Sequence, residues 1–110
     1  MPHEMFPADY VPGNLTRAAL SDLDRILEIS RAKWPGTYQS FRNTLLNHFR
    51  RIEDGTSLGH VRDDVKTRTI VKFIAVHPSQ YIIAYDEQQR IVLAILHGKR
   101  DFPKLFAAKR

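Results

Sequence analysis

The sequence predicts an α+β fold in which a helical hairpin packs on one face of a small antiparallel sheet. Two helical patterns of apolar residues come first, over about residues 17–33 and 37–54. Strand-like segments follow from about residue 67, and the last two are joined by a short polar turn. Helices that precede hairpin-joined strands are typical of the α+β class, and we expect three to four strands.

The length of 110 residues suits a single domain. Within it, residues 1–14 are expected to form an extended lead-in, because three prolines and a glycine oppose regular structure there. A short edge strand is expected near residues 10–15. Residues 103–110 are expected to form a basic tail. We find no repeat and no sign of a second domain.

The helix boundaries are marked by capping and turn residues. Thr16 is the predicted N-cap of a first helix over about residues 17–33. The Trp-Pro-Gly sequence at 34–36 then interrupts the helical pattern, since proline disfavours helix at the residue before it and glycine frees the turn. Thr37 is expected to cap a second helix that runs to about residue 54. Two amphipathic helices joined by so short a turn predict an antiparallel hairpin.

The second half of the chain is expected to form the sheet. Residues 56–66 predict a loop, and a first long strand is expected over about residues 67–76. A hairpin of two strands follows within residues 80–101. Its second strand, residues 91–97, is apolar on both faces, which favours a central strand covered on both sides over an edge strand. This strand runs directly into the charged sequence His-Gly-Lys-Arg-Asp, where we expect function.

The composition excludes several classes of function. The chain has no cysteine, which rules out a disulfide framework, a thiolate zinc site and a cysteine nucleophile. Its five histidines lack the spacing of a zinc site, so we expect no metal. We expect no cofactor either, because the sequence has no phosphate-binding glycine motif. No apolar run reaches the roughly 20 residues that span a membrane, and no signal pattern opens the chain. We therefore expect a cytoplasmic protein.

Positive charge is concentrated at the C-terminus. The chain carries a net charge of +5, and residues 99–110 contribute five basic side chains against one acidic one. Such an excess attracts an acidic partner, either a nucleic acid or an acidic protein segment. The alternative interpretation is a solvated tail without a partner.

Basic side chains along the predicted sheet are candidates for binding phosphates or carboxylates. Arg68 and Lys72 are four residues apart on the first long strand, so they share one face. Arg90 opens the last strand, and Lys99 and Arg100 follow its end. Together these side chains form a candidate binding surface on the sheet. The alternative is ordinary solvated charge on strand faces.

Three segments together resemble one known family. Residues 91–101 resemble an apolar strand that ends in a His-Gly-Arg-Arg-Asp sequence, with Lys99 in place of one arginine. Residues 19–26 resemble the Ala-x-x-Asp-Leu-x-x-Ile pattern of the family's first helix, and residues 58–64 resemble its Gly-x-x-Arg-Asp loop. The family is the ParE toxins of the RelE/ParE superfamily of bacterial type II toxin–antitoxin systems. The resemblance covers about residues 15–102 and implies the same α+β fold.

The resemblance implies one of two mechanisms. RelE-like members are ribosome-dependent mRNA endonucleases, whereas characterised ParE-like members poison DNA gyrase. RelE-type chains tend to read Tyr-Arg-x-x-Tyr where this chain has Tyr81 to Tyr85, and the arginine position holds Ile82. Isoleucine cannot donate a hydrogen bond to a phosphate. We therefore expect a non-enzymatic gyrase inhibitor; as a nuclease, its catalytic candidates would be His97 and Arg100.

The resemblance also implies a protein partner, a ParD-like antitoxin with a ribbon-helix-helix domain and an acidic C-terminal segment. The positive charge of the toxin favours such a segment. The aromatic contact candidates are Trp34, Tyr38 and Phe41, with an ordinary core role as the alternative. His97 joins the basic residues named above as a candidate for partner or target binding. A third interpretation, a non-toxic antitoxin-binding protein, stays open, as does the choice between a dimer and a toxin–antitoxin hetero-oligomer.

Overall fold

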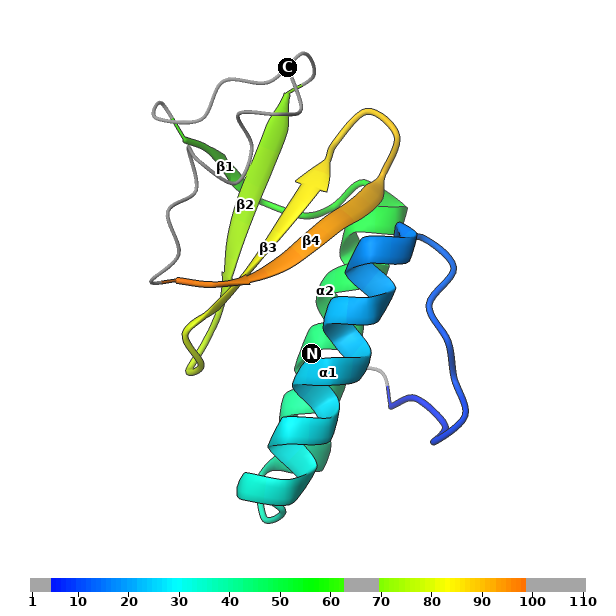
Figure 1. Cartoon of the computed structure of the whole chain (residues 1–110). Coiled ribbons are helices and arrows are strands. Elements are labelled where there is room, and N and C mark those ends of the chain that lie inside the picture. Colours follow the sequence, from blue (N-terminus) through cyan, green and yellow to red (C-terminus); the bar gives the residue numbers. More distant parts are fainter. Residues whose placement is uncertain (1–4, 63–69, 99–110) are drawn as a thin grey trace.

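A computed structural model describes residues 5–62 and 70–98 of the chain, and Figure 1 shows its two layers, a helical hairpin and a twisted sheet. The elements are α1 (Arg17–Lys33), α2 (Tyr38–Asp54), β1 (His60–Val61), β2 (Val71–Val76), β3 (Tyr81–Asp86) and β4 (Ile91–His97). The four strands form an antiparallel sheet in the order β1-β2-β3-β4. The predicted α+β fold, with helices first and the sheet after them, is confirmed.

The two helices begin in different ways. At the start of α1, the backbone N–H of Ala19 donates to Thr16 Oγ1 at 3.1 Å, so the predicted cap is confirmed. At the start of α2, Thr37 occupies the predicted N-cap position, but its side chain makes no capping hydrogen bond; the hydroxyl donates to the Trp34 carbonyl at 3.4 Å instead. Thr37 has ψ 2°, outside the extended region from which a capping side chain reaches the first helical turn. Gly55, with φ 76°, ends α2.

This difference predicts different costs for the same substitution. Thr16→Ala should lower the free energy of unfolding by about 1–2 kcal/mol, because Thr16 Oγ1 also donates to the Leu93 carbonyl at 3.1 Å. Thr37→Ala is the matched control and should change it by less than about 0.5 kcal/mol. Urea denaturation of the two variants measures both values. Equal losses would contradict the assignment of the caps.

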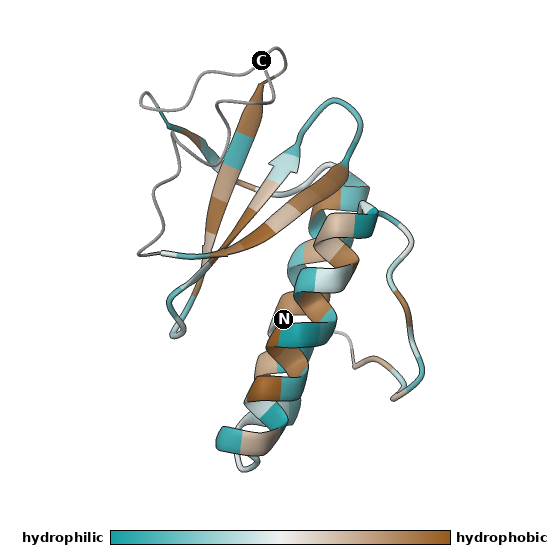
Figure 2. Ribbon diagram, in the orientation of Figure 1, coloured by the Kyte–Doolittle hydropathy of each residue, from teal (hydrophilic) through white to brown (hydrophobic). Residues whose placement is uncertain are grey.

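Two apolar clusters cover the two faces of the sheet. The helix-facing cluster contains Ala19, Leu23, Ile26, Leu45, Leu46, Phe49, Ile52, Val76, Ile83, Tyr85, Val92 and Ile95. The second cluster contains Val71, Phe73, Ala84 and Leu96. Because successive strand residues point to opposite faces, the second cluster lies on the side of the sheet away from the helices. Figure 2 shows the hydrophobic bands along the strands and the helices.

β4 is an edge strand, so the prediction of a central strand is wrong. Its two apolar faces belong to different clusters: Val92 and Ile95 are part of the helix-facing cluster, and Leu96 is part of the second one, with side chains of β2 and β3. The pattern of apolar residues indicates which faces of a strand are buried. It does not report the position of the strand within the sheet.

The open edge of β4 is covered by other parts of the chain. The N–H of Val92 donates to the Asn14 carbonyl at 2.7 Å, and the N–H of Thr16 donates to the Val92 carbonyl at 3.0 Å. Farther along, the N–H of Ile95 donates to Asp22 Oδ2 at 3.1 Å. The segment before α1 and the first turns of α1 therefore satisfy backbone groups that an edge strand would leave unpaired.

The predicted boundaries in the irregular segments need three corrections. The edge strand expected near residues 10–15 is reduced to an isolated parallel bridge at Leu15. The loop expected over residues 56–66 contains the two-residue strand β1, which pairs with β2. The strand expected over residues 67–76 is β2, which begins at Val71; residues 67–69 lie outside the described residues. Pairing with a distant strand, rather than local pattern, decides whether such short segments are strands.

Candidate functional site: an aromatic cleft

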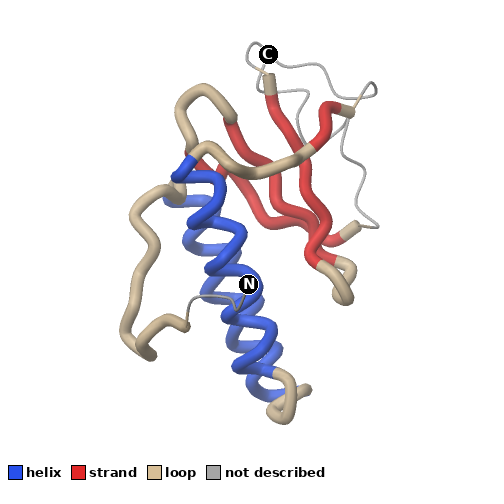
Figure 3. The backbone as a smooth tube through the Cα atoms, turned by 180° about the vertical axis from the view of Figure 1, so that it is seen from behind, coloured by secondary structure: helices blue, strands red, loops and turns tan. Residues whose placement is uncertain are grey.

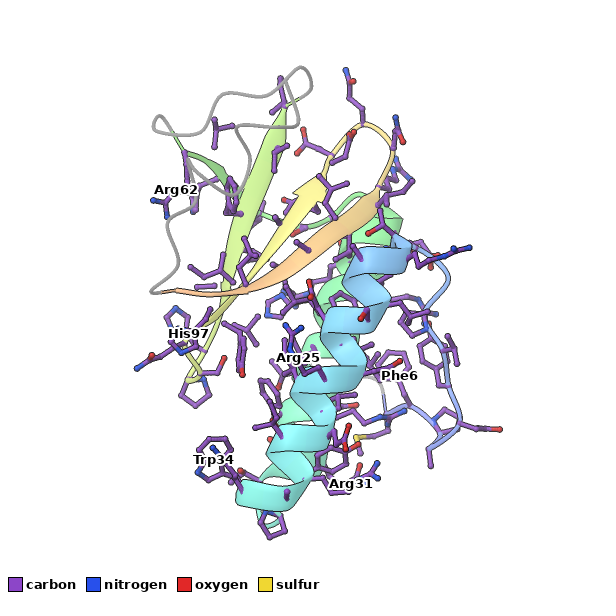
Figure 4. All side chains as sticks on the ribbon, viewed as in Figure 1. Phe6, Arg25, Arg31, Trp34, Arg62 and His97 are labelled. Carbon is purple, nitrogen blue, oxygen red and sulfur yellow. The ribbon has the colours of Figure 1, made fainter. Side chains whose placement is uncertain are left out.

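A cleft of about 570 Å³ opens between the tip of the helical hairpin and one end of the sheet. The end of α1 and the start of α2 form one wall, and the β2–β3 turn with the adjoining ends of β3 and β4 forms the other. Figure 4 shows Trp34 and His97 on the same side of the molecule, on the two walls. The aromatic and imidazole rings of the lining are Trp34, Tyr38, Phe41, His77, Tyr81 and His97.

The rings of the cleft contact one another across the two layers. The centroids of Phe41 and Tyr81 are 5.9 Å apart, and those of Tyr81 and His97 are 5.7 Å apart with an edge-on angle of 82°. Such tilted and edge-on pairs are the favourable arrangements of aromatic rings. Trp34 stands apart from this cluster in its exposure, since 57% of its surface is accessible. The site therefore combines a fixed aromatic floor with an accessible indole at its rim.

Tyr38 is held in the cleft wall by an arginine. Arg31 Nη2 donates to Tyr38 Oη at 3.0 Å, and the Arg31 guanidinium carbon lies 5.0 Å from the centre of the Tyr38 ring. The combination of a hydrogen bond and a cation–π contact fixes the orientation of the ring. The Tyr38 side chain is buried, although it belongs to a helix end.

The lining of the cleft combines aromatic rings with hydroxyl groups. Among the described residues that line the cleft there is no Asp or Glu, and the remaining lining residues include the hydroxyls of Ser30, Thr37, Ser40, Thr44 and Ser79. Aromatic walls with a few hydroxyl groups suit an apolar side chain delivered by a neutral or acidic segment. No carboxylate lines this cleft, but His97 also lines a second pocket, which includes Asp22 and Arg25.

Four of the predicted partner-binding residues come together here: Trp34, Tyr38, Phe41 and His97 line one cleft. Sequence reasoning did not include Tyr81 in the site, although Tyr81 and His97 are direct partners in the β3–β4 register. That pairing becomes visible only when the register of the hairpin is known, because a shift by one residue would move Tyr81 to the other face.

Lys72 lies at the other end of β3 from the cleft. It pairs with Tyr85 across the sheet, whereas His97 pairs with Tyr81, four residues away along β3. Lys72 forms an ion pair with Glu87, and its hydrogen bond to this carboxylate raises the pKa of the lysine. Its charge is therefore matched locally, and Lys72 lies well away from His97 along the sheet.

Arg90 lies in the β3–β4 turn, also away from the cleft. It adopts the left-handed conformation, with φ 58°, and its Nη1 donates to the Glu53 carbonyl at 3.4 Å near the end of α2. This bond places a cation beside the C-terminal end of the helix, which is favourable for the helix dipole. Arg68, Lys99 and Arg100 lie outside the described residues.

Ile82 lies on the face of the sheet away from the helices. It is partly buried against the second apolar cluster and pairs with Leu96 on β4. The position to which the family resemblance assigns a catalytic arginine in RelE-type chains is therefore part of an apolar layer. Figure 3 shows this face of the sheet turned away from the two helices.

Within residues 5–62 and 70–98, no group of three or more His, Cys, Asp or Glu side chains is placed to hold a metal ion. In the same part of the chain, neither helix is long and apolar enough to cross a membrane.

Comparison with known proteins identifies the family of the chain. A family model described as "ParE toxin of type II toxin-antitoxin system, parDE" matches residues 14–102, which is most of the chain. No curated protein and no solved structure matches the chain significantly. The match spans α1, α2 and the whole sheet, and it confirms the resemblance found in the three sequence motifs. The chain belongs to the family of ParE toxins of type II toxin–antitoxin systems.

Proposed function

We propose that this ParE-family toxin inhibits DNA gyrase without cleaving RNA, and that a ParD-like antitoxin silences it by binding the aromatic cleft. Membership of the family already implies a toxin with an antitoxin partner. The proposal adds the target, the absence of nuclease activity and the place where the antitoxin binds. We expect the toxin to act in the cytoplasm, where gyrase is found.

The environment of Ile82 carries the argument against RNA cleavage. Stabilising the charge that develops on a scissile phosphate requires donors aimed at its oxygens in a site from which water is excluded. Ile82 has no donor, and it packs against the apolar cluster that contains Phe73 and Leu96. His97 remains as a candidate acid or base, but its ring contacts Tyr81 in the cleft. Arg25 lines a second pocket with His97, but Arg25 Nη2 donates to Asp22 Oδ1 at 3.3 Å, so its charge is already matched by a carboxylate. A histidine beside an arginine that is paired in this way gives weak support to phosphate chemistry.

The cleft supports the assignment of the antitoxin. Its described lining has four aromatic rings and no carboxylate, so an acidic segment meets no like charge there. The net charge of the chain is +5, which attracts such a segment over a longer range. A large aromatic residue at the rim, such as Trp34, is the type of residue that dominates binding energy at protein interfaces.

Expression of the toxin alone in bacterial cells tests the mechanism. We expect growth arrest, relaxed plasmid DNA and intact transcripts, and we expect growth to resume when the antitoxin is co-expressed. Transcripts cut at defined positions, with the cuts lost in His97→Ala, would overturn the proposal in favour of a nuclease. Normal growth without the antitoxin would overturn it in favour of a non-toxic antitoxin-binding protein.

A further inference from the structure

A segment outside the family match runs along the helical hairpin. The match begins at residue 14, and residues 5–13, which we name the strap, lie before it. Figures 1 and 3 both show this segment beside the helices, on the side away from the sheet. Figure 4 shows Phe6 on the other side of the hairpin from Trp34 and His97. The strap therefore lies outside the part of the chain that matches the family model.

The strap and the two helices enclose a groove of about 490 Å³, which we name the outer groove. Residues 8–12 of the strap form one side of it, and Leu23 and Leu27 of α1 with Leu46 of α2 provide apolar surface on the other. Without the strap, this seam between α1 and α2 would face solvent. Exposed apolar surface of this kind marks places where proteins bind other segments.

A buried arginine holds the strap. Only 7% of the surface of Arg42, on α2, is accessible. Its Nη1 donates to the Phe6 carbonyl at 3.3 Å, and its Nη2 donates to the carbonyls of Pro7 at 2.7 Å and Ala8 at 3.5 Å. Among the described residues, no carboxylate forms an ion pair with Arg42. A buried guanidinium depends on hydrogen-bond acceptors, and here the backbone carbonyls of the strap supply them. The strap and the arginine therefore stabilise each other.

The rest of the strap is held loosely. Met5, Pro7, Ala8, Asp9 and Val11 are exposed. The strap forms no regular secondary structure, and its packing comes from buried Pro12 and from the half-buried rings of Phe6 and Tyr10, whose centroids are 4.7 Å apart. A segment with few buried contacts and one main attachment belongs to the least stable parts of a protein. Arg42 is therefore the latch on which closure of the strap depends.

The outer groove and the aromatic cleft share a wall. Among the described residues that line the two sites, Tyr38 is the only one that lines both. Arg31, which donates to Tyr38 Oη and lies over its ring, lines the outer groove. A change on the strap side therefore reaches the cleft through Arg31 and Tyr38. Arg42 also lines the outer groove and lies four residues, about one helical turn, after Tyr38 on α2.

We propose that the strap is a regulatory device: latched by Arg42, it closes the outer groove and, through Tyr38, fixes the wall of the aromatic cleft. Release of the strap loosens that wall and changes the affinity of the cleft for its partner. The functional meaning of this device rests on the binding role proposed for the cleft. Its mechanical part, the coupling of strap and cleft, concerns the isolated chain alone.

Two variants of the full chain test the device, with proteolysis and fluorescence as readouts. Arg42→Gln removes the latch, and Phe6→Ala with Tyr10→Ala loosens the strap while keeping Arg42. We expect both variants to raise the rate of proteinase K cleavage within residues 5–13 about tenfold or more. For Arg42→Gln, this factor corresponds to the stabilisation lost with hydrogen bonds from a charged donor. Trp34 is the sole tryptophan, so its emission reports on the cleft, and we expect it to shift to longer wavelength.

Arg51→Gln is the matched control, because Arg51 is an exposed arginine of the same helix that does not line the outer groove. It should behave as the wild type in both readouts. Cleavage of the strap at the wild-type rate in the variants would overturn the latch. Released strap with unchanged Trp34 emission would overturn the coupling to the cleft. Neither measurement involves gyrase or an antitoxin. Failure of the strap device can therefore be distinguished from failure of the proposed function. If Arg42→Gln does not fold, the Phe6→Ala, Tyr10→Ala variant decides the question.

Discussion

Replacing Trp34 by alanine should weaken antitoxin binding by about 30-fold or more, which corresponds to about 2 kcal/mol. The indole lies at the rim of the aromatic cleft with 57% of its surface exposed, so it has apolar area left to bury against a partner. An aromatic residue that becomes buried at an interface is a frequent centre of binding energy. Because it contributes little to the core, the free energy of unfolding should change by less than about 1 kcal/mol.

The matched control for this experiment is Leu58→Ala. Leu58 is another large apolar residue, 83% exposed, and it does not line the cleft. Calorimetric titration of the purified antitoxin into each toxin variant measures the affinities. Wild-type affinity in Trp34→Ala, or an equal loss in Leu58→Ala, would contradict the assignment of the cleft as the antitoxin site.

Replacing Gly59 by alanine should lower the free energy of unfolding by about 2–3 kcal/mol. The added Cβ would lie 2.7 Å from Tyr85 Cε1 and 2.9 Å from its Cζ, and closer still to its hydroxyl. Tyr85 is only 1% exposed and its ring cannot move aside without disturbing the core. The same change strains the hydrogen bond that the Gly59 N–H donates to Tyr85 Oη at 3.0 Å.

Gly36→Ala serves as the control, since nothing lies within 4 Å of the Cβ that it would add. Its free energy of unfolding should stay the same or rise by less than about 1 kcal/mol, because alanine restricts the unfolded chain more than glycine does. Urea denaturation gives both values. A stable Gly59→Ala variant would show that the segment before β1 does not pack on Tyr85 as described.

The helices were predictable because their signals are local. The apolar periodicity and the Thr16 cap lie within one or two turns of the residues that they determine, and both helix ranges agree with the structure. Thr37 shows the limit of such reasoning: the residue type suits a cap, but the backbone conformation at the tight turn decides whether the side chain reaches an amide. Residue type alone does not fix that conformation.

The position of β4 was not predictable from its own residues. An apolar strand indicates buried faces; here one face packs against α1 and α2, which are distant in sequence, and the other joins a cluster with side chains of β2 and β3. The protection of its edge depends on Asn14, Thr16 and Asp22, more than 70 residues away from their partners. Polar residues that serve a distant strand edge look like ordinary surface residues in the sequence.

The sequence predicts some of the residues that line the cleft, but neither Tyr81 nor the shape of the cleft. Trp34, Tyr38 and Phe41 were named from the helical hairpin and His97 from the family motif, and only the packing of the hairpin on the sheet brings them to one cleft. The sequence contains no pattern that predicts the role of Arg42, because an arginine in an amphipathic helix is normally solvated. Its burial follows from the path of the strap, which no local pattern encodes.

A supercoiling assay with purified gyrase and relaxed plasmid DNA tests the central claim most directly. The account predicts that the toxin inhibits supercoiling in a dose-dependent way, that the antitoxin restores it, and that RNA added to the same reaction stays intact. Undiminished supercoiling at a large molar excess of correctly folded toxin would contradict the account.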